Sequence, residues 1–210
     1  MIVGMLGAGQ MAQTLARGWL PAGHEIRFAN SRGPESLADL VAELGPGASA
    51  VTPPELAGAD VIVLAVRWTQ LPDAIAGVGS LAGKIVVDAT NNRVGPRPED
   101  VLDLGGRTSS EVVAGYLPGA RVVKAFNHLP IPSLGTLREH PEPLALFLAG
   151  DDDAAKAVVA GLIRDLGGAP VDTGGLVEGG RLQGTGGGPL AGHGRALTGA
   201  EASAILARHG

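Results

Sequence analysis

MIVGMLGAGQMAQTLARGW, residues 1–19, contains the pattern that most strongly predicts the fold class. It begins with a short apolar run, passes through a glycine-rich turn and continues with helical periodicity. The turn, GAGQMA at 7–12, matches the G-x-G-x-x-A pattern that joins the first strand to the first helix of dinucleotide-binding domains. Gly7 permits the tight turn, Gly9 lets a diphosphate approach the backbone, and Ala12 allows the helix to pack closely on the strand.

A diphosphate bound here would lie on the helix N-terminus, where backbone N–H groups and the helix dipole favour an anion. We therefore expect Gly7, Gly9, Gln10 and Met11 to bind a dinucleotide cofactor. The alternative is a glycine turn that serves only the fold.

Five further apolar runs follow, separated by helical segments: EIRFAN (25–30), VIVLAV (61–66), KIVVDAT (84–90), RVVKAF (121–126) and PLALFLAG (143–150). Continuous apolar strands of this kind are typical of a parallel sheet covered on both faces. The chain is therefore predicted to be α/β, with a Rossmann-type doubly wound, mostly parallel sheet and a short C-terminal extension. Capping boxes at Thr52, Thr108 and Thr198 mark helix starts.

Composition narrows the function classes. A chain of 210 residues can bury one sizeable core, and its net charge of −5 argues against a nucleic-acid or membrane-surface binder. The absence of cysteine excludes disulfides and thiol chemistry. No apolar run is long enough to cross a membrane and the N-terminus lacks a signal pattern, so a cytoplasmic protein without a membrane partner is expected. The carboxylates of GDDD (150–153) are interpreted as a helix cap, and no metal site is predicted.

The chain is predicted to divide into residues 1–173, a dinucleotide-binding domain, and residues 174–210, a C-terminal segment with a short helix at 199–208. Residues 174–194 are almost half glycine, which costs the most backbone entropy on ordering. This stretch is interpreted as a flexible connector, or alternatively as a lid or a close backbone approach to a ligand.

The second strand ends without an acid. In NAD-binding domains an acid about 20 residues past the glycines binds the ribose 2′-hydroxyl, and a 2′-phosphate would be repelled by it. Here Asn30 is neutral, Ser31 offers a hydroxyl, and Arg32 offers a planar fork that matches phosphate. The predicted cofactor is therefore NADP(H). The alternative is that Arg32 is a solvated side chain in an ordinary loop.

Ligands of open α/β sheets bind at the carboxyl ends of the strands. Ala65, Val66 and Trp68 follow the third run there and are expected to contact ribose or nicotinamide, although Trp68 could instead pack on the next helix.

Two polar pairs close the next strands, Asn91 with Asn92 and Asn127 with His128. Asn92 and Asn127 are predicted cofactor contacts, with a structural turn role as the alternative for each pair. His128 is the candidate catalytic acid, because it is the titratable side chain best placed for proton delivery.

The sequence resembles the family of NADPH-dependent oxidoreductases that act on coenzyme F420, related to the reductase part of transmembrane ferric reductases and to pyrroline-5-carboxylate reductases. The resemblance covers residues 1–176 and is carried by GAGQM, NSR, and two longer stretches: SSEVVAGYLPGARVVKAFNHLP (109–130) and AGDDDAAKAVVAGLIRDLGGAPVDTGGL (149–176). It implies a Rossmann domain, often dimeric, that moves a hydride to or from nicotinamide. The longer apolar C-terminal segment of the F420 enzymes is replaced here by the glycine-rich stretch.

Three functions follow from these observations. The first is hydride transfer between NADP(H) and a second cofactor such as coenzyme F420 in a homodimeric enzyme. The second is reduction of a small imine or ketone, and the third is a non-catalytic NADP sensor. For either enzyme the acceptor pocket is predicted beside the nicotinamide, with residues 174–194 or a second subunit as its lid. Its expected lining is Trp68, Asn92, Asn127, His128 and Pro130.

Overall fold

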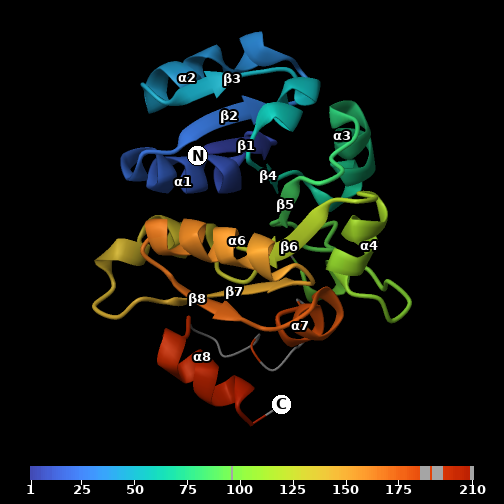
Figure 1. The fold of residues 1–210 in the computed structure, drawn as a ribbon, viewed down its shortest axis with the longest axis vertical. Helices are drawn as coiled ribbons and strands as arrows, with labels where there is room; N and C mark the ends of the chain where they lie inside the picture. The colour runs from blue at the N-terminus through green and yellow to red at the C-terminus, as the bar shows by residue number, and fades with distance from the viewer. Residues whose placement is uncertain (96, 185–189, 191–195, 209–210) are drawn as a thin grey trace.

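One eight-stranded sheet organises the chain in the computed structural model, which describes residues 1–95, 97–184, 190 and 196–208 (Figure 1). The strand order is β3-β2-β1-β4-β5-β6-β7-β8. The strands are β1 (Ile2–Leu6), β2 (Glu25–Ala29), β3 (Ala48–Ala50), β4 (Val61–Leu64), β5 (Ile85–Asp88), β6 (Arg121–Ala125), β7 (Ala145–Gly150) and β8 (Ala169–Asp172).

All neighbouring strands pair in parallel except β6 and β7. The predicted doubly wound, mostly parallel Rossmann-like sheet is thus confirmed. Strand order reverses between β1 and β4, which is the position where such sheets bind ligands.

The described part of the chain contains eight α-helices, of which α7 and α8 follow the last strand. They are α1 (Gln10–Trp19), α2 (Ala38–Leu44), α3 (Leu71–Val78), α4 (Ser109–Gly115), α5 (Ile131–Gly135), α6 (Asp153–Asp165), α7 (Leu176–Leu182) and α8 (Gly199–Leu206). Short 3₁₀ helices lie at Leu20–Ala22, Pro34–Leu37, Pro53–Gly58, Trp68–Gln70, Pro98–Asp100 and Leu137–Glu139. None of the described helices is long and apolar enough to cross a membrane.

Alternation along the buried strands divides the core between the two faces of the sheet. Val3 and Met5 of β1 face α1 and α6, whereas Ile62 and Leu64 of β4 face α3 and α4. Figure 1 shows these two helix pairs on opposite sides of the sheet. Apolar side chains on both faces explain why the strands are nearly continuous hydrophobic runs.

The capping boxes occur as predicted. Thr108 and Thr198 each accept a hydrogen bond from the backbone of the glutamate three residues later, and Glu55 accepts from the backbone N–H of Thr52. The hydrogen bond from the Thr108 backbone N–H lowers the pKa of Glu111. Two edge strands escape the sequence analysis, since β3 has only three residues and β8 contains Pro170. Proline is tolerated at a sheet edge because no ladder N–H is needed there.

The glycine-rich stretch differs from its interpretation as a connector, because its first part forms α7. A Cβ on Gly179 would lie 2.6 Å from the Ala149 Cβ, and one on Gly180 would lie 3.1 Å from Thr108. These glycines therefore let α7 pack directly on β7 and α4. Residues 185–189 and 191–195 lie outside the described residues, and nine of the 21 residues of the proposed lid are among them. The predicted 199–208 helix is α8, which ends at Leu206.

Candidate functional site

The turn after β1 requires glycine at its first position. Gly7 has φ of 109°, and its N–H donates to the Ala29 carbonyl at 2.8 Å. A Cβ at this position would lie 2.5 Å from the carbonyl oxygen of Ala65. Gly7 thus allows the carboxyl ends of β1, β2 and β4 to approach one another closely.

Gly9 is glycine for a different reason. Its backbone is extended, with φ of −77°, and a Cβ there would meet nothing within 4 Å. Gly9 caps α1, whose first residues, Gln10 and Met11, have backbone N–H groups without acceptors inside the helix. The space in front of Gly9 therefore fits an anion on the helix N-terminus.

A cavity of about 480 Å³ begins at this turn, between the ends of β1, β2 and β4. Seven of the predicted cofactor residues line it: Gly7, Gly9, Asn30, Ser31, Arg32, Ala65 and Val66. Gln10 and Met11 do not line it. The structure also contributes lining residues that the sequence analysis missed, including Pro53, Arg67, Gln70, Asp73 and Ala74.

Asn30 organises the loop at the end of β2. Its Oδ1 accepts from the Arg32 backbone N–H at 2.9 Å, and its Nδ2 donates to Ser36 Oγ at 3.0 Å. Arg32 is exposed at the cavity, and no ion-pair partner for it is found within the described ranges. The loop thus presents a cation and a hydroxyl, with no acid at the end of β2.

A second cavity of about 320 Å³ adjoins the first and shares Val66 and Arg67 with it. Loops after β4 and β5 form its walls. Trp68 lines this cavity and also packs against the hydrophobic core.

Three polar residues of the loop after β5 line the second cavity: Thr90, Asn91 and Arg93. Asn92, the predicted contact, does not line it. Asn92 Nδ2 donates to the Leu102 carbonyl at 2.7 Å and closes the loop between β5 and α4. Whether Asn91 or Asn92 lines the cavity depends on the backbone conformation of the loop after β5, which the sequence pattern does not specify.

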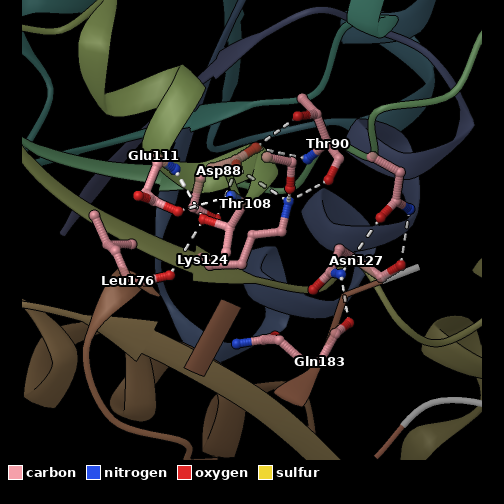
Figure 2. Close-up of polar contacts among 11 residues, drawn as sticks. Asp88, Thr90, Thr108, Glu111, Lys124, Asn127, Leu176 and Gln183 are labelled. Atoms are coloured by element: carbon pink, nitrogen blue, oxygen red, sulfur yellow. Dashed lines mark hydrogen bonds and ion pairs between the residues drawn. The ribbon is translucent and has the colours of Figure 1, made fainter. Parts of the chain in front are cut away.

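Beneath the second cavity lies a buried ion pair that the sequence analysis did not identify. Lys124 of β6 and Asp88 of β5 are 2% and 0% exposed, and Lys124 Nζ lies 3.0 Å from Asp88 Oδ2 (Figure 2). The same ammonium donates to the Thr90 carbonyl and, at 3.3 Å, to Ser109 Oγ. Asp88 Oδ1 accepts from the N–H and the hydroxyl of Thr90 at 2.9 and 2.6 Å.

Asn127 forms a second connection at the end of β6. Its carbonyl accepts from Asn91 Nδ2 at 2.9 Å, and its own Nδ2 donates to the Gln183 carbonyl at 3.4 Å (Figure 2). The preceding residue, Phe126, has φ of 64°, a left-handed conformation that is strained for a bulky residue. Its buried ring packs edge-to-face on Trp19 with centroids 5.7 Å apart, which holds that conformation.

His128 lies in neither cavity. Its ring stacks on Phe147 at a centroid distance of 4.1 Å, and Nε2 is 3.1 Å from the Ala145 carbonyl. Burial lowers the pKa of His128 to about 4, because the charged ring loses its hydration. Since a carbonyl only accepts, Nε2 carries the proton, and Nδ1 is a buried acceptor without a partner among the described residues.

Each carboxylate of the GDDD motif has its own structural partner. Asp152 caps α6 by accepting from the Ala155 N–H at 2.7 Å, and Asp151 accepts from the Leu176 N–H at the start of α7. Asp153 pairs with Lys156 at 3.0 Å. The predicted cap is confirmed, and the described residues contain no group of three metal-binding side chains.

Comparison with known proteins places this geometry in context. Residues 2–92, which contain both glycine positions and the Asn30 loop, match the family model described as NADP oxidoreductase coenzyme F420-dependent. The rat (Rattus norvegicus) protein named Metalloreductase STEAP3 is 31% identical over 181 residues, which are 84% of this chain. The chain spans 34% of that relative's length.

Two solved structures extend the similarity over most of the chain. A hypothetical protein from Sinorhizobium meliloti is 38% identical with a TM-score of 0.83, covering 94% of this chain and 95% of the other. A candidate F420-dependent NADP reductase from Arthrobacter sp. is 26% identical with a TM-score of 0.69, covering 83% and 84%. Pyrroline-5-carboxylate reductase from Coxiella burnetii, 18% identical over 81% of this chain and 57% of the other with a TM-score of 0.58, shares the fold.

Proposed function

We propose that this chain transfers a hydride between NADP(H) and a second cofactor such as coenzyme F420, because residues 2–92 match the model of a family of NADP-dependent oxidoreductases. The observation that carries the proposal is the first cavity. It combines an open helix N-terminus at Gly9 with an acid-free wall of Asn30, Ser31 and Arg32.

The residues divide the binding of NADP(H) between the two cavities. The N-terminus of α1 takes the diphosphate at Gly9, and Arg32 with Ser31 takes the 2′-phosphate. Ala65 and Val66 line the first cavity, and Val66 also lines the second. The nicotinamide half extends from there toward Trp68 and Asn91. When bound, NADPH supplies the hydride from its nicotinamide ring.

The two classes of hydride acceptor differ in whether they need a proton from the protein. Hydride transfer between two cofactors requires mainly that two rings lie face to face, and the protein needs no acid of its own. A carbonyl or imine acceptor needs a proton donor. His128, the sequence-based candidate for that role, is a neutral ring whose proton is already donated to the Ala145 carbonyl. This geometry favours a flavin-like acceptor over an imine or ketone.

Asn127 lines neither cavity, but it contacts Asn91, which lines the second cavity, and we propose a supporting role for it near the nicotinamide. It is 6% exposed, and its Oδ1 has no hydrogen-bond partner within the described part of the chain. An unpaired buried acceptor of this kind matches the N–H₂ group of the nicotinamide carboxamide.

The experiment that tests the function is an NADPH oxidation assay with coenzyme F420, FMN, ferric complexes and a panel of cyclic imines and ketones. Turnover with F420 or FMN is expected. Turnover with imines or ketones alone would support the reductase alternative. Tight NADPH binding without oxidation by any acceptor would instead support a sensor.

The assembly and the location are also part of the proposal. We expect a homodimer in the cytoplasm, with the acceptor pocket covered by the C-terminal segment or by the second subunit. Sedimentation of the purified chain tests the dimer, since a monomer that oxidises NADPH normally would contradict a shared pocket.

A further inference from the structure

Lys124 is an unusual residue for its position. It lies in the middle of the sheet, in a strand whose other buried residues, Val122, Val123 and Ala125, are apolar, and only 2% of it is exposed. Placing an ammonium and a carboxylate in such a core gives little or no net stability compared with well-packed apolar side chains. Stability alone therefore does not account for the pair that Lys124 forms with Asp88.

The hydrogen bonds of Lys124 show what the pair accomplishes. All three donors of the ammonium have partners: Asp88, the Thr90 carbonyl and Ser109 Oγ. Two of these partners belong to the segment where β5 ends and turns toward the second cavity. Asp88 holds the same turn from within, since its Oδ1 binds both the N–H and the hydroxyl of Thr90.

The next residue along this segment is held from the other side. Asn91 donates to the Asn127 carbonyl at 2.9 Å, and Asn127 Nδ2 approaches Asn91 Oδ1 at 3.4 Å. Thr90 and Asn91 both line the second cavity. Thr90 is thus held by Lys124 of β6, and Asn91 by Asn127, which follows that strand (Figure 2).

Ser109 and Ser110 extend the network to the first turn of α4. Ser109 Oγ contacts Lys124, and Ser110 Oγ lies 3.4 Å from Asp88 Oδ2. The start of α4 is also held by α7, because Thr108 Oγ1 donates to the Leu176 carbonyl at 3.4 Å. The wall of the second cavity is therefore tied to β6, α4 and, through α4, to α7.

We propose that Lys124 and Asp88 are positioning residues for the nicotinamide half of NADP(H), acting through the Thr90–Asn91 wall of the second cavity. The inference rests on the proposed function, because it places the nicotinamide half there. Neither side chain lines either cavity, so neither touches the cofactor directly. The adenosine half, bound by the turn after β1 and the Asn30 loop, does not depend on them.

The test compares two ligands that share the adenosine half. Adenosine 2′,5′-bisphosphate carries the 2′-phosphate but no nicotinamide, whereas NADPH carries both. Calorimetry gives the dissociation constants of both ligands for the parent chain, Lys124→Met and the double variant Asp88→Asn/Lys124→Met. Both variants remove the donor to the Thr90 carbonyl, and the double variant also avoids leaving a buried charge without its partner.

Lys84→Met is the matched control. Lys84 also donates to a backbone carbonyl, that of Ala59 at 3.2 Å. It precedes the amino end of β5, whereas the second cavity lies beyond the carboxyl end of that strand. We expect Lys84→Met to bind both ligands as the parent does. Both Lys124 variants should bind adenosine bisphosphate within about twofold of the parent and NADPH roughly tenfold more weakly, as expected when one positioned contact is lost.

Two results would overturn the inference. Equal weakening of both ligands would show that the pair only stabilises the fold, and unchanged NADPH affinity would show that the wall needs no anchor. If Lys124→Met does not fold, the double variant decides. The proposed function fails separately, when the parent binds NADPH but reduces no acceptor, and the ratio of the two dissociation constants still tests the positioning role.

Discussion

The two halves of the crevice are built in different ways. At the end of β1 and β2 the site consists of backbone and of exposed side chains from one short stretch, with Gly7, Gly9 and the Asn30 loop as its parts. At the end of β5 and β6 the wall is held by a buried ion pair and by amide contacts between strands. The first half can be read from local sequence, whereas the second exists only after the strands have paired.

The difference has an energetic side. Gly9 borders open space, so a change there affects a ligand and leaves the fold intact. Lys124 and Asp88 are surrounded by protein, so a change there affects the fold as well as the wall. Substitutions in the first half should therefore change mainly ligand affinity, whereas substitutions in the second half should also change the stability of the fold.

Gly9→Val should remove NADPH binding. A side chain at this position would occupy the place of the diphosphate on α1, and we expect at least about a thousandfold loss of affinity, on the order of 4 kcal/mol. Fluorescence titration measures the loss, and an unchanged melting temperature shows that the fold persists. Gly7→Ala is the contrasting variant, because its Cβ would meet the Ala65 carbonyl at 2.5 Å and should lower the melting temperature. NADPH binding retained by Gly9→Val would place the diphosphate elsewhere.

Lys124→Met should destabilise the fold by about 3–5 kcal/mol, because it leaves the buried Asp88 carboxylate without its partner. For a chain of this length that corresponds to a fall in melting temperature of roughly 6–20 °C. The double variant Asp88→Asn/Lys124→Met should recover much of this loss. Chemical denaturation of both variants provides the measurement, and a single variant as stable as the parent would contradict a buried charged pair.

His128 should make stability depend on pH. Its pKa is lowered to about 4 in the folded chain and returns to about 6.5 on unfolding, so the unfolded state binds more protons between these values. Stability is therefore complete above pH 6.5 and declines toward pH 4, by up to about 3 kcal/mol. Denaturation of the parent and of His128→Phe across this range should show a shallower decline for the variant. Identical pH profiles would exclude His128 as a source of the dependence.

Arg32→Ala should weaken NADPH binding by about 1.5–3 kcal/mol, or roughly tenfold to a hundredfold, because a charge-assisted contact to the 2′-phosphate is lost. NADH lacks that phosphate and should bind the variant and the parent equally. Titration of both nucleotides decides the matter, and an equal NADPH affinity in parent and variant would show that Arg32 is only a solvated loop residue.

His128→Ala should have the smallest effect on turnover with F420, within about threefold, since that transfer needs no acid from the protein. Steady-state rates with F420 and with an imine distinguish the alternatives. A fall of about a hundredfold or more with an imine or ketone would restore His128 as the general acid of such a reductase.

Features that depend on neighbouring residues along the chain could be predicted from the sequence. The β-strand and helix alternation, the glycine turn, the acid-free end of β2 and the capping boxes are all local patterns, since each depends on residues within about one turn or one strand of each other. Asn30, Ser31 and Arg32, which local sequence predicts as cofactor contacts, all line the first cavity.

Features that depend on pairing across the sheet could not be predicted from the sequence and were found only in the folded structure. Lys124 and Asp88 are 36 residues apart, and nothing in RVVKAF or KIVVDAT indicates that the two charges meet. The choice of Asn91 over Asn92, the stacking of His128 on Phe147 and the packing of α7 through Gly179 are decided in the same way. Burial removes water from these groups, and their partners are then set by the register of neighbouring strands and helices, which local sequence does not encode.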